Sequence, residues 1–377
     1  MNVLYFSLDY TPHDHRFLAS LAESGQEVHY LRLERRARQL EDRPVPEQVR
    51  QVAWRNGTSP FAWRDWLPTV LELRRILGEI KPDVVHAGPV QSCAFLAALA
   101  GAAPLVSMSW GSDMLKDAYA TAWMGRVTRF TLGRTSVLAA DCEAVLRAAE
   151  EFGFDSRRSA LFPWGIDLGR FAPAAGESAL RARLGWEEQF VILSLRSWEP
   201  VYGVDVVVRA FARAVEQEPR LRLLLLGGGS LAGQIQGLLN ERGLHGLVHL
   251  GGQVSQNDLA RYYHAADLYV SASHSDGSSV SLMEALGCGL PALVSDIPGN
   301  REWIVPGQAG RLFADGDAAG LAEGMLEAAR DPEGLERMRR EARALAERRA
   351  NWPDNFQKLL AGYALAQKVA TNGKAAG

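Results

Sequence analysis

Short apolar runs alternate with amphipathic segments along the whole chain, a pattern typical of strands alternating with helices. The runs that predict strands span residues 3–8, 27–31, 49–54, 84–86, 105–109, 137–140, 190–195, 221–226, 247–250, 268–271 and 292–295. Helical periodicity lies between or after them, at 16–24, 63–80, 92–100, 143–152, 204–217, 231–242, 257–265, 281–286, 321–330, 332–349 and 354–369. Strand–helix–strand units of this kind form parallel sheets covered by helices, so we expect an α/β fold with doubly wound parallel sheets.

The length of the chain and its breaks predict two domains. A chain of 377 residues exceeds the size at which one hydrophobic core keeps growing. Residues 162–167 and 173–176 have linker composition and no periodicity. A break at 351–353 lets the last helix turn away from the second domain and lie on the first. We expect Rossmann-like domains over residues 1–167 and 168–353, facing a cleft, then a helix that crosses back and a frayed tail over 354–377.

Charge and cysteine usage narrow the class of protein. The 41 basic and 44 acidic residues are interspersed, so no basic stripe predicts a nucleic-acid partner. Cys93, Cys142 and Cys288 lie far apart and without metal-ligand spacing, which favours a reducing compartment and argues against structural zinc. The first residues lack the basic start of a signal peptide, and no apolar run reaches about 18 residues. We therefore expect a cytoplasmic protein.

A cluster of aromatic and basic residues leaves a second location open. Its members are Trp54, Phe61, Trp63, Arg64, Trp66, Arg74 and Arg75. A cluster of this kind is more often a packed helix with a solvated face than a membrane anchor. We expect the packed helix, and peripheral contact with the inner face of the membrane remains the alternative.

Two carboxylates and a helix start meet in one short segment, from Asp276 to Glu284. The segment follows the buried run 268–271, so it should lie at the carboxyl edge of a sheet, where open α/β sheets bind ligands. Ser281 and Glu284 have the spacing of a capping box, which predicts a helix N-terminus suited to a phosphate. The carboxylates can accept hydrogen bonds from sugar hydroxyls. The alternative is a purely structural segment, with Glu284 only capping the helix and Asp276 only in a turn.

Arg196 and a glycine-rich loop are further candidates in the second half. Arg196 follows the run 190–195, and a strand-end guanidinium suits a phosphate because it donates two parallel hydrogen bonds. An exposed surface arginine is the alternative. The loop 227–230, with Gly228 as a candidate nucleotide contact, resembles a dinucleotide-binding turn. The acidic residue expected about 20 positions later is absent, which disfavours a nicotinamide enzyme.

In the first half, polar residues follow two predicted strands. His13, Asp14 and His15 come after the first strand, and Asp113 follows the run 105–109. These side chains could act in acid–base catalysis or position a hydroxyl. For Asp113 a helix N-cap is an equal alternative. The two histidines do not predict a metal site, because no third ligand from another element accompanies them.

These segments together resemble glycosyltransferase family 4, whose members have the two-Rossmann-domain GT-B fold. The segment Asp276–Glu284 is similar to the family's E-x7-E motif, with aspartate in the first acidic place. Residues 163–167 resemble its P-x-G-V-D segment, and Arg196 with residues 203–205 resembles its arginine-to-K-G-v-D segment. Residues 298–302 resemble the stretch that follows the next strand. The resemblance covers nearly the whole chain.

The resemblance implies roles for individual residues. Arg196 would bind the diphosphate of a nucleotide sugar, Glu284 the ribose hydroxyls and Asp276 the hydroxyls of the donor sugar. The remaining implied contacts are the backbone of Ser279, Val280 and Ser281 with the phosphate, and the main chain of Val254 with the base. Three places depart from the family pattern: Tyr202 stands where a lysine is usual, residues 11–16 where the family has a glycine-rich loop, and Trp110 where a histidine is often found. His13, His15 or Asp113 could take the place of that histidine.

We therefore predict a retaining, metal-independent glycosyltransferase. It would move a sugar from a nucleotide diphosphate sugar, bound by the second domain, to an acceptor bound mainly by the first. The acceptor would be a saccharide, a lipid-linked molecule or a small molecule, and no cofactor is required. Two other classes remain open, a nucleotide-sugar epimerase or phosphorylase on a similar fold, and a binding protein without catalytic activity.

Overall fold

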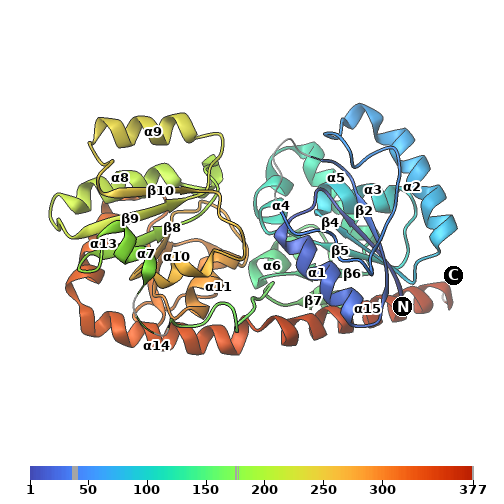
Figure 1. Cartoon of the computed structure of the whole chain (residues 1–377). Coiled ribbons are helices and arrows are strands. Elements are labelled where there is room, and N and C mark those ends of the chain that lie inside the picture. Colours follow the sequence, from blue (N-terminus) through green and yellow to red (C-terminus); the bar gives the residue numbers. More distant parts are fainter. Residues whose placement is uncertain (36–40, 175, 177, 376–377) are drawn as a thin grey trace. The chain divides into compact units, whose positions relative to one another are not determined.

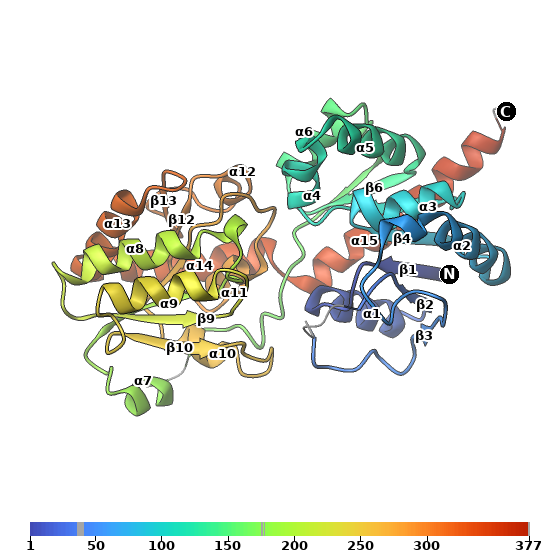
Figure 2. The ribbon, with the colours of Figure 1, turned by 90° about the horizontal axis from the view of Figure 1, so that it is seen from above.

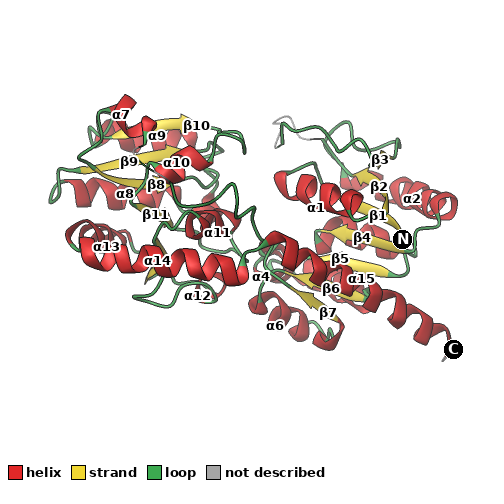
Figure 3. Ribbon diagram, turned by 60° about the horizontal axis from the view of Figure 1, so that its bottom comes forward, coloured by secondary structure: helices red, strands yellow, loops and turns green. Residues whose placement is uncertain are grey.

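The computed structural model describes residues 1–35, 41–174, 176 and 178–375, which fold into two α/β units (Figure 1). Unit 1 consists of Met1–Pro163 together with Pro353–Gly377, and unit 2 of Trp164–Trp352. Figure 3 shows that strands form the middle of each unit and helices cover them. The predicted class, two doubly wound parallel-sheet domains, is confirmed.

Unit 1 is built on a parallel sheet of seven described strands in the order β3-β2-β1-β4-β5-β6-β7. Its strands are β1 (Asn2–Ser7), β2 (Glu27–Arg32), β3 (Arg50–Gln51), β4 (Val84–Gly88), β5 (Leu105–Met108), β6 (Val137–Ala140) and β7 (Ser159–Leu161). Its helices are α1 (Pro12–Glu23), α2 (Trp66–Ile80), α3 (Phe95–Leu99), α4 (Ser112–Leu115), α5 (Ala122–Arg134), α6 (Glu143–Glu151) and α15 (Trp352–Ala375), with shorter helical turns η1 (Trp63–Asp65), η2 (Val90–Ala94), η3 (Asp117–Tyr119) and η4 (Ser156–Arg158).

Unit 2 repeats the scheme with six described parallel strands in the order β10-β9-β8-β11-β12-β13. Its strands are β8 (Phe190–Ser194), β9 (Leu221–Leu226), β10 (Val248–Gly252), β11 (Leu268–Ser271), β12 (Ala292–Ser295) and β13 (Gly310–Phe313). Its helices are α7 (Ala179–Leu184), α8 (Val204–Val215), α9 (Ala232–Glu241), α10 (Ala260–His264), α11 (Val280–Gly287), α12 (Pro298–Arg301), α13 (Ala318–Arg330) and α14 (Pro332–Arg349), with the turn η5 (Pro200–Tyr202).

The central strands of both sheets are continuous apolar runs because helices cover both of their faces. In unit 2, Leu223 and Leu225 of β9 pack in one buried cluster with Val207 and Phe211 of α8 and Leu321 of α13. Burying such a leucine or phenylalanine contributes about 1.5–3 kcal/mol each. The two sheets are therefore rigid platforms, and the loops at their carboxyl edges are free to carry function.

The chain passes between the units close to the predicted linker. The sequence places the boundary at 167/168, whereas Trp164 already belongs to unit 2. The reason is local pairing: Ile166 N donates to Ala350 O at 2.7 Å, and Trp352 N donates to Ile166 O at 3.2 Å. Ala175, in the predicted second linker segment, lies outside the described residues.

Helix α15 packs against the sheet of unit 1 (Figure 2). The hydroxyl of Tyr363 lies 2.6 Å from Nδ1 of the fully buried His86 on β4. Gly362 allows close approach, because a Cβ there would lie 2.7 Å from Cβ of Ala160 on β7. The helix extends beyond the predicted end at residue 369, and residues 376–377 of the predicted frayed tail lie outside the described residues.

Candidate functional site

The loop between β11 and α11 carries Asp276 at the carboxyl edge of the unit 2 sheet. β11 ends at Ser271, and α11 begins at Val280 with Ser279 as its N-cap residue. All the paired strands of this sheet are parallel, so the loops after β8, β9 and β11 emerge at the same edge. The first turn of α11 therefore follows Asp276 at this edge.

The predicted capping box of Ser281 and Glu284 is wrong. Helix α11 begins at Val280, before Ser281, and its N-cap residue is Ser279, whose side chain makes no capping hydrogen bond. The Oγ of Ser281 contacts Tyr269 at 2.8 Å, and the carboxylate of Glu284 accepts a hydrogen bond from Tyr263. The purely structural alternative for Glu284, a capping side chain, is thereby removed.

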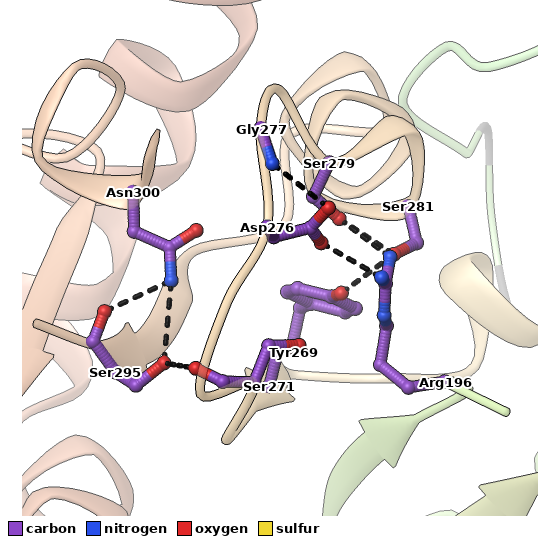
Figure 4. A network of polar contacts seen from close by, with 10 residues as sticks. Arg196, Tyr269, Ser271, Asp276, Gly277, Ser279, Ser281, Ser295 and Asn300 are labelled. Atoms are coloured by element: carbon purple, nitrogen blue, oxygen red, sulfur yellow. Dashed lines mark hydrogen bonds and ion pairs between the residues drawn. The ribbon is translucent and has the colours of Figure 1, made fainter. Parts of the chain in front are cut away.

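Arg196 reaches this place from the carboxyl end of β8 (Figure 4). Its Nη2 lies 2.7 Å from Oδ2 of Asp276. Its Nη1 donates to Oγ of Ser279 at 2.9 Å and to Oγ of Ser281 at 3.2 Å. The guanidinium carbon also lies 4.2 Å from the ring centroid of Tyr202, a cation–π contact. Five residues predicted for one ligand site are thus in direct contact.

Burial and charge set the protonation of this cluster. The side chains of Arg196 and Asp276 are only 14% and 16% exposed. Burial acts to lower the pKa of Arg196, but the Asp276 carboxylate and the nearby tyrosine hydroxyls raise it above its usual value. Burial raises the pKa of Asp276, and Arg196 opposes that change. The guanidinium remains a cation that an incoming anion can share with Asp276.

Glu284 lies in α11 itself and is buried, with 2% of its surface exposed. The hydroxyl of Tyr263, on α10, lies 2.8 Å from its Oε2 and 3.1 Å from the carbonyl of Ser281. Burial and the charge of Glu284 raise the pKa of Tyr263 well above its usual value, so the phenol stays protonated and donates. Sequence reasoning missed Tyr263, because an aromatic residue on an apolar helix face is indistinguishable from ordinary core.

A second missed residue, Gly299 on α12, supports the Asp276 loop. A Cβ at this position would lie 2.3 Å from the carbonyl oxygen of Gly277 and 2.5 Å from that of Asp276. Trp303 Nε1 donates to Oγ of Ser278 at 3.1 Å in the same loop. The segment 298–302 was noted for its resemblance to the family, but its physical role follows only from this close packing.

Small polar side chains hold the ends of β11 and β12 together behind the loop (Figure 4). The Oγ atoms of Ser271 and Ser273 lie 3.0 Å apart, and Ser295 Oγ donates to the carbonyl of Ser273. Asn300 Nδ2 donates to the carbonyl of Ser295 at 2.9 Å. This buried network orders the backbone from which Asp276 extends.

The glycine-rich loop after β9 binds a carboxylate of the same chain, that of Glu199. The backbone N–H of Ser230 donates to Oε1 of Glu199 at 3.0 Å, and the Ser230 hydroxyl donates to the other carboxylate oxygen. The carbonyl of Gly228 accepts from Trp198 N at 3.1 Å. A Cβ on Gly228 would meet no atom within 4 Å, so this glycine borders open space. Val254 lies half-buried in the loop after β10.

The polar residues predicted after β1 lie on a helix rather than on a loop. Helix α1 begins at Pro12, with Thr11 as N-cap and Asp14 completing a capping box, so His13 and His15 occupy its first turns. The His15 Nδ1 lies 2.7 Å from the hydroxyl of Tyr10. Burial, reinforced by a nearby arginine, lowers the pKa of His15, so its imidazole is neutral at pH 7.

Asp113 of unit 1 joins the loops after β4 and β5. Its Oδ1 accepts from Ser109 Oγ at 2.7 Å and Trp110 N at 2.8 Å, and its Oδ2 accepts from Val90 N at 3.0 Å. The N-cap alternative is wrong, because the N-cap residue of α4 is Gly111. Burial raises the pKa of Asp113, against the opposing effect of these donors.

Among the described residues, no group of three or more His, Cys, Asp or Glu side chains could hold a metal ion. No described helix is both long enough and apolar enough to span a bilayer.

Solved structures define the class of fold. Anabaena HepE in complex with UDP and glucose superposes with a TM-score of 0.80 at 19% identity, over 97% of this chain and 99% of HepE. Sucrose-phosphate synthase from Thermosynechococcus elongatus superposes with a TM-score of 0.80 at 18% identity, over 98% and 100% of the two chains. The protein has the GT-B fold.

Sequence comparisons define the family. Residues 177–345 match the model "Glycosyl transferases group 1", and residues 2–141 match "Glycosyl transferase 4-like". The chain belongs to this glycosyltransferase family, of family 4 type. The D-inositol 3-phosphate glycosyltransferase of Kineococcus radiotolerans is 32% identical over 183 residues, which are 46% of this chain and 40% of that protein. Its namesake in Thermomonospora curvata is 30% identical over 266 residues, 66% and 60% of the two chains. The matches thus span about half the length of these curated relatives.

Proposed function

We propose that the protein is a retaining glycosyltransferase that moves a sugar from a nucleotide diphosphate sugar to an acceptor hydroxyl. The observation that carries the proposal is the meeting of Arg196, Asp276 and the first turn of α11 at one edge of the unit 2 sheet. A guanidinium and exposed amides suit a diphosphate, and a carboxylate suits sugar hydroxyls. Membership of the family supports the same conclusion.

In the proposed reaction the bond between the anomeric carbon and the diphosphate oxygen breaks, and a bond to the acceptor oxygen forms on the same face of the sugar. The acceptor proton passes to the leaving diphosphate. Arg196 and the N-terminus of α11 stabilise the negative charge that develops on the leaving oxygen. They supply the positive charge for which other enzymes use a divalent ion, and we therefore propose a metal-independent reaction.

The remaining donor contacts follow from position. Glu284, oriented by Tyr263, accepts hydrogen bonds from the ribose hydroxyls, and Asp276 accepts from the donor sugar. The main chain of Val254 and of Gly228 borders the base. Because HepE, which shares the fold, was crystallised with UDP and glucose, a UDP-sugar is the first donor to test.

The acceptor is proposed to bind unit 1, near His15 and Asp113. The neutral imidazole of His15 can accept a proton or a hydrogen bond from an acceptor hydroxyl. Saccharides, lipid-linked molecules and small molecules all present such a hydroxyl. The curated relatives are named for D-inositol 3-phosphate, so a phosphorylated polyol belongs in the first acceptor panel.

Thermal denaturation with UDP, GDP or ADP tests the donor site, because a ligand that binds only the folded state raises the Tm. We expect one nucleotide to raise the Tm of the wild type and of Arg209→Gln, a matched surface variant on α8, but not that of Arg196→Gln. Equal shifts in Arg196→Gln and the wild type would contradict the proposal.

Incubation with UDP-glucose and an acceptor panel, with and without EDTA, tests the chemistry. Formation of a glycoside with retained anomeric configuration supports the proposed reaction. Inversion, loss of activity in EDTA, or an altered sugar in the absence of acceptor would each contradict it. Tight donor binding without turnover on any acceptor would indicate a binding protein instead.

A further inference from the structure

The turn η1 and the first half of helix α2 in unit 1 expose apolar side chains to water, although α2 also buries apolar side chains in the core. Its inner face, with Val70, Leu73 and Ile76, packs into the core of unit 1. The apolar residues of the outer side form what we call the α2 patch, with exposed fractions of 49% for Trp63, 43% for Trp66, 50% for Leu67 and 59% for Leu71.

A surface helix normally presents polar residues to solvent, so the α2 patch departs from the expected pattern. Trp63, Leu67 and Leu71 follow each other at four-residue intervals, and Trp66 lies beside them at helical spacing. Of the aromatic residues in the predicted cluster, Trp54 and Phe61 pack against the core, whereas Trp63 and Trp66 are exposed. Their clustering on one face, from η1 into the first turns of α2, indicates a partner rather than scattered exposure.

The α2 patch is held in place rather than loosely attached. The Trp63 ring packs edge-on against Phe61, with ring centroids 5.3 Å apart, and tilted against Phe95 at 6.4 Å. Because these contacts fix the indole before any partner arrives, less side-chain entropy is lost on binding.

The charge around the α2 patch identifies the kind of partner. Residues 50–81 contain six basic and three acidic side chains, although the whole chain has a net charge of −3. Arg64 is 88% exposed beside Trp63, and Arg55 and Arg74 are exposed on the same segment. Tryptophan and arginine side by side suit the boundary between lipid headgroups and acyl chains, where indoles lie at the interface and guanidiniums pair with phosphates.

We propose that the α2 patch docks unit 1 onto the surface of an anionic phospholipid bilayer. A second copy of the chain fits less well, because a two-fold contact would place the same arginines against each other. The patch enters the interface from one side only, so the protein lies on the bilayer and does not span it. This inference is independent of the proposed donor site, which lies in unit 2.

Co-sedimentation with vesicles tests the inference. The purified full chain is mixed with vesicles of phosphatidylcholine alone or with 30% (mol/mol, roughly) phosphatidylglycerol, at about 0.1 M salt. We expect binding to the anionic vesicles, reduced about tenfold or more in Leu67→Ser/Leu71→Ser and reduced in Arg64→Glu/Arg74→Glu. Val305→Ser, which removes an exposed apolar side chain from unit 2, should bind as the wild type does.

Three results would overturn the inference. The first is no binding of the wild type to anionic vesicles, and the second is equal binding by Leu67→Ser/Leu71→Ser. The third is a wild-type dimer in sedimentation velocity that becomes monomeric in that variant, since the patch would then contact a second copy. Circular dichroism melts establish that each variant is folded, and the exposure of the replaced leucines predicts unchanged Tm values.

Discussion

The guanidinium of Arg196 and the carboxylate of Asp276 form a buried ion pair, with Nη2 and Oδ2 2.7 Å apart. The two residues lie on loops that follow neighbouring strands, β8 and β11, and Ser279 and Ser281 hold the same guanidinium from the start of α11. The pair thus joins the group expected to bind the diphosphate to the group expected to bind the sugar.

Breaking this pair from one side should cost both stability and binding. Arg196→Gln leaves the Asp276 carboxylate buried without its cation, which should destabilise unit 2 by roughly 3 kcal/mol. Nucleotide affinity should fall about ten- to one-hundred-fold, since a charge-assisted contact is lost. The double variant Arg196→Gln/Asp276→Asn should recover stability but not affinity. Denaturant melts measure the stability, and calorimetric titration with UDP measures the affinity. If the double variant recovers both stability and affinity, Arg196 does not bind the diphosphate.

Tyr263→Phe tests the orientation of Glu284 by removing a single oxygen. The variant should lose about 1 kcal/mol of stability and bind nucleotide roughly three- to tenfold more weakly, because the carboxylate loses its donor. Tyr119→Phe removes a comparable hydroxyl from an exposed pair with Glu151 in unit 1 and serves as the control. If both variants bind nucleotide like the wild type, Tyr263 has only a packing role.

Gly299→Ala should displace the Asp276 loop without touching a ligand. The new methyl would lie 2.3 Å from the carbonyl of Gly277, so the loop must move. We expect kcat/KM to fall about tenfold or more, because a small misplacement of binding groups is costly. Gly237→Ala, on α9, meets no atom within 4 Å and should leave activity unchanged. Steady-state kinetics measure kcat/KM for both variants. Equal kcat/KM values for Gly299→Ala and Gly237→Ala would show that Gly299 does not position the loop.

Unit 1 contains two buried titratable groups whose effects on stability have opposite signs. Burial raises the pKa of Asp14 to about 6 and lowers that of His86 to about 3. The contribution of Asp14 is present below about pH 4 and is lost as the pH rises through 6, whereas that of His86 is lost as the pH falls from about 6.5. The two slopes therefore oppose each other.

Asp14→Asn removes the slope due to Asp14 and keeps the slope due to His86, so stability should rise more steeply between pH 4.5 and 7 than in the wild type (roughly 3 kcal/mol at full effect). Asp117→Asn, at an exposed carboxylate, is the control. Denaturant melts at several pH values give the slopes. Parallel profiles for Asp14→Asn and the wild type would show that Asp14 titrates normally in the folded chain.

The sequence predicted the fold well where elements are long and apolar, and poorly at the sheet edges. The central strands were predicted because helices bury both of their faces. The edge strands β7 and β13 were missed, since each is at most four residues long and at least half of its positions are partly exposed. Helix α5 was missed because polar residues interrupt its apolar stripe.

Some residues of the candidate site can also be predicted from the sequence, and others cannot. Asp276, Arg196 and Ser281 could be selected from sequence, because loop position and residue type are local properties. Tyr263 and Gly299 could not be selected. The role of Tyr263 depends on a contact with Ser281, which is distant in sequence, and that of Gly299 on close packing against another loop. The predicted capping box failed for a related reason: tertiary partners took both of its side chains.

A crystal structure of the protein with UDP tests the proposed donor site most directly. We expect diphosphate oxygens within hydrogen-bonding distance of the Arg196 guanidinium and of the first amides of α11, and a ribose hydroxyl within that distance of the Glu284 carboxylate. A nucleotide bound elsewhere on the chain, with Arg196 still paired only to Asp276, Ser279 and Ser281, would contradict it.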